Sequence, residues 1–275
     1  MLAAAGRLSL LQSSGRVVAL ARGAGGYRSP GGEEPYIALA PALRRGCSFG
    51  TGTVYALRLH NGRGVVAIGP RGRVHRFAGV SAPGLIDGIA FDGTGHFGHR
   101  LLVTINAGRR TTVESIGCHG AVTTVTRDAP RVEGGIAVAP ATFGRFAGDL
   151  IAPDEQGGRI FAIAPNGRSF LLARSDLPHG QDVGVESEAF VPRGARDALL
   201  ADRVSPGNRH PGDDLVLRIR GAALRGAGVQ PGDLLIATEG AARTDAIRCA
   251  PAGCRVRHVA DGPAIAHAEG HIAFF

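Results

Sequence analysis

Residues 131–178, RVEGGIAVAPATFGRFAGDLIAPDEQGGRIFAIAPNGRSFLLARSDLP, contain four short apolar runs that Gly and Pro separate from one another. The runs predict strands at Glu133–Ala139, Asp149–Pro153, Arg159–Ile163 and Arg168–Leu172, because apolar stretches of this length bounded by turn residues are typical of β-structure. Short links between consecutive strands favour an antiparallel meander. This stretch therefore predicts one four-stranded sheet.

The same unit recurs along the chain. The turn before its fourth strand ends at Gly167, and matching turns end at Gly120 and Gly72, at steps of 47 and 48 residues. Copies of the first strand occur at 36–39, 88–91, 135–138, 188–191 and 271–274, and copies of the second at 53–57, 101–105, 150–152, 198–201 and 234–237. Repeats of this length, too small to bury both sheet faces alone, predict an all-β propeller of four-stranded blades.

The blade count is five or six, because residues 203–233 interrupt the repeat. This insertion contains a turn-rich loop, a strand at Leu215–Ile219 and a short helix after Ala222. The last residues, His271–Phe275, form a terminal strand that we expect to close the ring by pairing with the N-terminal unit. The single propeller domain spans 35–275, and the Gly-rich residues 1–34 are predicted to be a leader or a disordered segment.

The amino-acid composition limits the classes of binding partner that we expect. The net charge is +8, but the arginines are scattered, lysine is absent and aromatic residues make up 5% of the chain, so nucleic-acid binding is not expected. An apolar run long enough to span a membrane is also absent. The expected partner is a small molecule, a glycan or a protein, and the chain is expected to be a monomer.

Four cysteines suggest the compartment. Cys249 and Cys254 bracket a predicted hairpin turn, while Cys47 and Cys118 fall on one face of neighbouring units, so these two disulfides are predicted. Reduced thiols, or a zinc site with an atypical ligand spacing, are the alternatives. Disulfides favour an oxidising location, extracellular or in the cell envelope, although residues 1–34 show no clear signal peptide.

Two motifs carry a resemblance. Asp87-Gly-Ile-Ala-Phe-Asp92 and Ala162-Ile-Ala-Pro-Asn-Gly167 resemble blade motifs of the NHL, gluconolactonase-like and streptogramin-lyase-like propellers, and the likeness covers residues 36–275. The resemblance implies the propeller fold. Gluconolactonase-like enzymes hold a divalent metal at the central axis with Glu, Asn and Asp side chains from different blades, and only these residue types can be matched here.

Blade topology predicts an acid-rich face. In an antiparallel blade the start of the first strand and the end of the second emerge on the same side. First strands begin near Asp87, Glu133, Glu186 with Glu188, and Glu269. Second strands end near Asn106, Asp154 with Glu155, Asp202, and Glu239. The flanking loops add His179, His267 and His271 to this face.

Crowded carboxylates repel one another unless something neutralises them. One interpretation is a divalent cation, Ca²⁺ or another metal, held by Asp87, Glu133, Glu186 and Glu269 because first strands line the axis. Asn106, Asp154, Glu155, Asp202 and Glu239 would then bind ligand. The other interpretation is that these acids cap turns and accept backbone N–H bonds.

Two functions follow. The first is a secreted propeller that binds a small polar ligand, glycan or protein on the acid-rich face, with a structural cation in one version. The second is a metal-dependent, lactonase-like hydrolase or lyase, in which His179, His267 or His271 transfers a proton. The sequence lacks G-x-S-x-G and H-E-x-x-H motifs, which argues against serine hydrolases and zincins.

Overall fold

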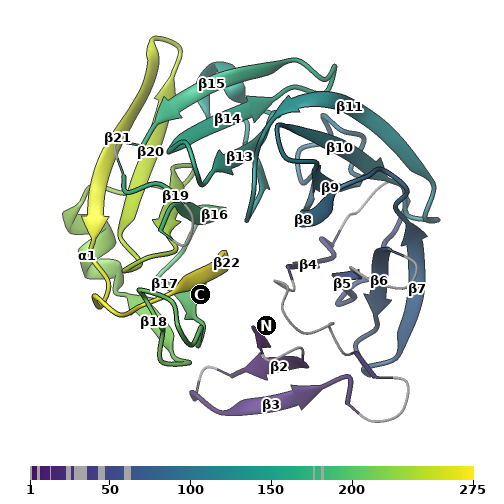
Figure 1. Cartoon of the computed structure of the whole chain (residues 1–275), viewed down its shortest axis with the longest axis horizontal. Helices are drawn as coiled ribbons and strands as arrows, with labels where there is room; N and C mark the ends of the chain where they lie inside the picture. Colours follow the sequence, from purple (N-terminus) through teal and green to yellow (C-terminus); the bar gives the residue numbers. More distant parts are fainter. Residues whose placement is uncertain are drawn as a thin grey trace.

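The computed structural model describes residues 2–4, 7–12, 14–22, 26–27, 36–42, 47–58, 63–175, 177–180 and 183–275. The predicted boundary at residues 34–35 lies outside them. Figure 1 shows sheets arranged around a central axis, with β8, β16 and β22 close to it. Among the described residues, no helix has the length and apolar character needed to cross a membrane.

The propeller has five blades, within the predicted count of five or six. Four of them have four strands. The first contains β4 (Ile37–Leu39), β5 (Val54–Arg58), β6 (Gly64–Ile68) and β7 (Val74–Gly79), and the second contains β8 (Leu85–Phe91), β9 (Leu101–Asn106), β10 (Arg110–Ile116) and β11 (Val122–Pro130). The third blade corresponds to the repeat unit at residues 131–178. It contains β12 (Ala137–Val138), β13 (Leu150–Asp154), β14 (Arg159–Ile163) and β15 (Ser169–Arg174).

The chain interleaves the fourth and fifth blades. The fourth contains β16 (Val185–Phe190), β19 (Leu234–Thr238), β20 (Thr244–Ala250) and β21 (Gly253–Ala260), and the fifth contains β22 (Ala268–Phe274), β17 (Ala198–Asp202) and β18 (Val216–Ile219). The predicted insertion strand and helix are β18 and α1 (Gly221–Gly226). After β16 the chain enters the fifth blade, returns for β19, and ends as the innermost strand of the fifth.

Two predicted pairings are therefore wrong. The strand at 198–201 pairs with β22 and β18, although it follows β16 at the spacing expected within one blade. The C-terminal strand closes the fifth sheet by pairing with β17, whereas we expected it to pair with the N-terminal unit. The spacing of the repeats cannot show that β19, and not β17, pairs with β16, because the sequences of β17 and β19 both fit the pattern of a second strand.

The N-terminal segment contains strands, although the sequence predicts a leader or disorder there. β1 (Leu2–Ala4), β2 (Arg7–Leu11) and β3 (Val17–Leu20) form a separate three-stranded sheet. Figure 1 shows β2 and β3 between the first and fifth blades. Leu8 is fully buried and belongs to one apolar cluster with Val54 and Ile68 of the first blade.

Packing explains the strand sequences. Every residue of β13 is buried, because Ile151 packs in the cluster toward the fourth blade while Leu150 and Ala152 pack in the cluster toward the second. Sheets covered on both faces need continuous apolar runs. Outer strands have one open edge, and β7, β11, β15 and β21 each show a register irregularity, a feature that discourages edge-to-edge pairing.

Close contact near the axis shortens one predicted strand. Gly135 donates a backbone hydrogen bond to Glu186 O at 2.8 Å, so the inner segment of the third blade pairs sideways with the fourth. A Cβ atom at Gly134, which has φ +93°, would lie 2.7 Å from the same oxygen. This pairing leaves β12 with two residues in place of the predicted 133–139.

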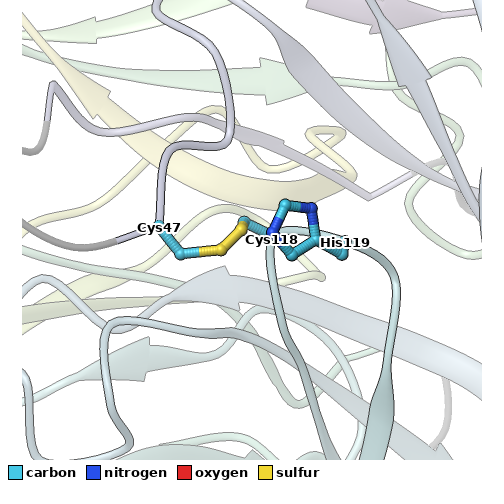
Figure 2. A group of neighbouring side chains, drawn as sticks. All are labelled: Cys47, Cys118 and His119. Carbon is cyan, nitrogen blue, oxygen red and sulfur yellow. A yellow bond between two sulfur atoms is a disulfide. The ribbon is translucent and has the colours of Figure 1, made fainter.

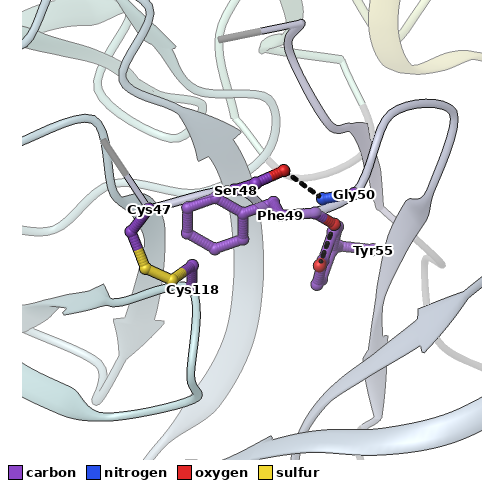
Figure 3. Close-up of a disulfide and its surroundings, with 6 residues drawn as sticks. All are labelled: Cys47, Ser48, Phe49, Gly50, Tyr55 and Cys118. Atoms are coloured by element: carbon purple, nitrogen blue, oxygen red, sulfur yellow. Dashed lines mark hydrogen bonds between the residues drawn. A yellow bond between two sulfur atoms is a disulfide. The ribbon is translucent and has the colours of Figure 1, made fainter. Parts of the chain in front are cut away.

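Both predicted disulfides are present, and the described residues include no free cysteine. Cys249 and Cys254 join opposite positions of the β20–β21 hairpin. Cys47 and Cys118 link the segment before β5 to the β10–β11 turn, beside His119 (Figure 2). Next to this bridge Tyr55 donates a hydrogen bond of 2.7 Å to Phe49 O (Figure 3). The bridge therefore connects the first two blades.

Candidate functional site

Three ionisable side chains converge beside the fourth and fifth blades. His267 Nε2 lies 2.7 Å from Glu239 Oε1 and 2.7 Å from Glu269 Oε1. In the part of the chain that the structure describes, groups of three potential metal ligands within 4.8 Å are this one and Cys47–Cys118–His119. The second contains bonded sulfurs, which are not thiolate ligands. Glu239, His267 and Glu269 are therefore the candidate site, called here the EHE cluster.

The backbone holds this cluster in place. Glu239 directly follows β19, while His267 precedes β22 and Glu269 lies within it. Ala268 donates a backbone hydrogen bond of 2.8 Å to Glu239 O, and Gly240 forms a bridge with His267. His267 N also donates to Asp202 Oδ1 at 2.9 Å. The interleaving of the two blades thus brings the end of one second strand beside the start of another first strand.

Electrostatics stabilise a protonated imidazole here. Burial alone would lower the pKa of His267, but hydrogen bonds and charges of Glu239 and Glu269 outweigh burial and raise it to about 10. Arg203 Nη1 adds a second positive charge, 2.5 and 2.6 Å from the two Glu269 oxygens. The two carboxylates are thus balanced by two cations of the protein itself.

The insertion loop is fixed beside the cluster. Arg203 N donates to His267 O at 2.9 Å, and Gly212 N donates to Ile265 O at 2.8 Å, so both ends of the loop are fixed to the segment before β22. His210 Nδ1 lies 2.7 Å from Ala264 O, and its ring packs against Gly240. The cluster residues are buried, while the Arg203 side chain is 41% exposed.

Other predicted residues lie in contacts on this face. Asn106 Nδ2 donates to Glu133 at 3.2 Å across two blades, and Arg131 also pairs with Glu133. Thr104 donates to Asp87 at 2.9 Å. The remaining predicted acids are buried: Glu155, whose backbone oxygen accepts from Gly180; Asp154, which pairs with Arg159; Glu186; and Asp202. Asp87, Glu133 and Glu186 belong to neither group of converging ligands.

The three predicted histidines differ in environment. His267 belongs to the cluster. His179 is exposed, and its Nδ1 lies 3.2 Å from Leu177 O in the loop beside Glu155. His271 is half-buried with Nε2 3.0 Å from Ile89 O, and burial lowers its pKa despite that bond. Of the three histidines, His267 is the one whose ring contacts two predicted carboxylates, those of Glu239 and Glu269.

Sequence reasoning did not single out Arg203, His210 or Asp213. All three belong to the insertion. Asp213 is exposed, and a hydrogen bond with Asp202 raises its pKa. The sequence does contain one signal for these residues, because the insertion begins directly after Asp202, an acid at the end of a predicted second strand. The path of the insertion could not be predicted, because no other blade has a matching segment.

Glu188 provides a stability prediction. It is fully buried, and burial raises its pKa well above the ordinary value although the Ala137 N–H lowers it. The folded state keeps a proton that the unfolded state releases, so wild-type stability should fall as pH rises above about 4.5. Glu188→Gln should reduce this fall and give a more stable protein near neutral pH, as measured by urea unfolding across pH.

Glu133→Gln is the matched control, since Glu133 pairs with Arg131 and is only partly buried. It should not make the protein more stable near neutral pH. Identical pH dependence of unfolding in wild type and Glu188→Gln would contradict a buried neutral carboxyl group.

Comparisons with known proteins agree with the fold. No protein-family model and no curated protein matches the sequence. A streptogramin B lyase structure matches with TM-score 0.51 and 12% identity over 98% of this chain and 83% of that chain. The periplasmic gluconolactonase of Pseudomonas aeruginosa matches with TM-score 0.45 and 15% identity over 94% and 78%.

A further structure, assigned as a gluconolactonase, matches with TM-score 0.45 and 15% identity over 71% of this chain and 64% of that chain. Identities this low bear on fold and leave chemistry to the site. The resemblance seen in the blade motifs is thus matched in three dimensions, and the chain shares the β-propeller fold of the streptogramin B lyase.

Proposed function

We propose that this protein is a secreted β-propeller that binds a divalent cation at the EHE cluster and, with it, a small polar ligand on the acid-rich face. The observation that supports the proposal is the convergence of His267 Nε2, Glu239 Oε1 and Glu269 Oε1. The two disulfides are consistent with an extracellular protein.

The residues fit a cation of intermediate hardness. An imidazole nitrogen and two carboxylate oxygens suit Mn²⁺ or Zn²⁺, whereas Ca²⁺ prefers oxygen ligands alone. The ligand atoms lie within 4.8 Å of one another, so small side-chain shifts would bring all three to one ion. A fourth position would remain for a ligand oxygen. Asp202 accepts a hydrogen bond from His267 N, and it would thereby hold the backbone of His267 in position for metal binding.

A second candidate is a hydrolase or lyase that uses the same cation. The shared fold with an enzyme named as a streptogramin B lyase favours it. A bound cation would polarise a substrate carbonyl. His179, exposed in the loop beside Glu155, is the residue that could then take up a proton. Turnover of a lactone and ester panel by wild type, lost in His179→Ala with cation affinity retained, would support this candidate.

Mn²⁺ titration tests the cation site. Wild type should bind Mn²⁺ by calorimetry and melt at a higher temperature when Mn²⁺ is present. Since Mn²⁺ must displace the His267 proton, its affinity should increase by up to about tenfold per pH unit below the pKa of His267. Glu239→Gln should lower the affinity by about tenfold or more, because one anionic ligand is lost.

Glu133→Gln is again the control, since Glu133 lies outside the cluster. It should leave Mn²⁺ affinity unchanged. The proposal fails if folded wild type binds neither Mn²⁺ nor Zn²⁺, or if Glu239→Gln and Glu133→Gln bind equally well.

A further inference from the structure

Arg203 is the solvent-facing member of the network around the EHE cluster. Its side chain is 41% exposed, whereas the side chains of Glu239, His267 and Glu269 are 6%, 2% and 8% exposed. One guanidinium nitrogen contacts both oxygens of Glu269. Arg203 is therefore the member of this network that solvent reaches most.

Charge balance makes Arg203 a competitor for a cation. Glu239 and Glu269 carry two negative charges, and the Arg203 guanidinium lies against both oxygens of Glu269. A divalent ion adds two more positive charges to a buried site, where like charges repel strongly. The enclosed His267 ring would bind the ion, whereas the Arg203 side chain can rotate toward solvent because part of it is already there.

Arg203 also lies at one end of the insertion loop 203–212. It is the first residue of the segment 203–212, and its backbone N–H bonds to His267 O. At the other end of the segment, Gly212 approaches Arg203 O so closely that a Cβ atom there would lie 1.8 Å away, and its φ is +60°. The Arg203 residue therefore stands at the closed base of the loop.

We propose that Arg203 is an internal plug: it occupies the cation site from the solvent side through Glu269, and cation entry displaces it and loosens the loop 203–212. This inference rests on the proposed cation site. The propeller repeat does not require the insertion, and on this proposal the insertion controls access to the cation site.

Arg203→Gln tests the plug with Mn²⁺ as the probe. The variant should bind Mn²⁺ about tenfold more tightly than wild type or better, because a competing positive charge is gone. In hydrogen-exchange mass spectrometry, Mn²⁺ should speed exchange of residues 203–212 in wild type and leave β18 unchanged. In Arg203→Gln this loop should exchange quickly with or without Mn²⁺.

Arg218→Gln is the matched control, because Arg218 pairs with Asp197 in the same blade and lies outside the cluster. It should match wild type in Mn²⁺ affinity. Arg203→Lys, which keeps the charge, should bind Mn²⁺ more weakly than Arg203→Gln. Arg203→Met, which also removes the charge, should bind Mn²⁺ more tightly than wild type and serves if the glutamine variant misfolds.

The outcomes separate the two proposals. If wild type binds Mn²⁺ but Arg203→Gln does not bind it more tightly, or if Mn²⁺ slows exchange in the loop, the plug is overturned and the cation site stands. If folded wild type binds neither Mn²⁺ nor Zn²⁺, the cation site itself fails and the plug fails with it.

Discussion

Replacing His267 with alanine is expected to destabilise the folded protein by about 3–5 kcal/mol, the usual cost of removing one partner from a buried charge network. His267 is 1% exposed, and its Nε2 is the bridge between Glu239 and Glu269. Without it, two carboxylates remain buried within a few ångströms of each other, and the Arg203 contact is with Glu269. Urea unfolding of wild type and His267→Ala at neutral pH measures the loss.

Two comparisons isolate the charge effect from the lost volume of the ring. Adding Glu239→Gln to His267→Ala should recover part of the stability, since one buried negative charge is then removed. His179→Ala, a change at an exposed histidine, should cost little. If His267→Ala is no more destabilising than His179→Ala, the buried ion network has been assigned incorrectly.

The same network predicts how wild-type stability depends on pH. The pKa of His267 is raised from 6.5 to about 10 in the folded protein. The stabilisation from its charge is therefore fully present below about pH 6.5 and is lost as pH rises through about 10. His267→Ala should lack that alkaline loss, which distinguishes a missing charge from a simple packing defect.

Repeats predicted the blades because each strand's side chains are constrained by two neighbouring sheets. The turns ending at Gly72, Gly120 and Gly167 mark the same position in three successive blades, and the structure places them before β7, β11 and β15. Such periodic constraints are visible in one sequence. The exchange between β17 and β19 is not, since either strand satisfies the apolar pattern and the choice depends on which sheet the returning chain reaches.

The candidate site was predicted in part for a similar reason. Blade topology placed Glu239, His267 and Glu269 on one face, and they meet there. Some of the crowded acids do not need an external cation, because arginines, which follow no repeat, lie beside them. Arg131 pairs with Glu133 and Arg159 with Asp154, so much of the predicted negative charge is neutralised locally. The EHE cluster differs because its own cations, His267 and Arg203, contact shared carboxylates at a single point.

Loss of the Cys47–Cys118 disulfide should destabilise the protein more than loss of Cys249–Cys254. The first closes 71 residues and the second closes 5. In the chain-entropy model a bridge limits the freedom of the unfolded chain, so these loops correspond to about 4 and about 2 kcal/mol. Cys47→Ser with Cys118→Ser, and Cys249→Ser with Cys254→Ser, compared by thermal and urea unfolding, measure the difference.

The position of each disulfide in the fold predicts the same order of stability losses as its loop length does. Cys47–Cys118 joins two blades, and Phe49, two residues from the bridge, packs its ring against Tyr55, Phe77 and Phe91 of those blades. Cys249–Cys254 joins strands that are already hydrogen-bonded partners. Reduction of the first should therefore also increase hydrogen exchange in β5 and β10, whereas reduction of the second should affect the β20–β21 hairpin alone. Equal destabilisation by both double variants would show that the Cys47–Cys118 bridge does not hold the first two blades together.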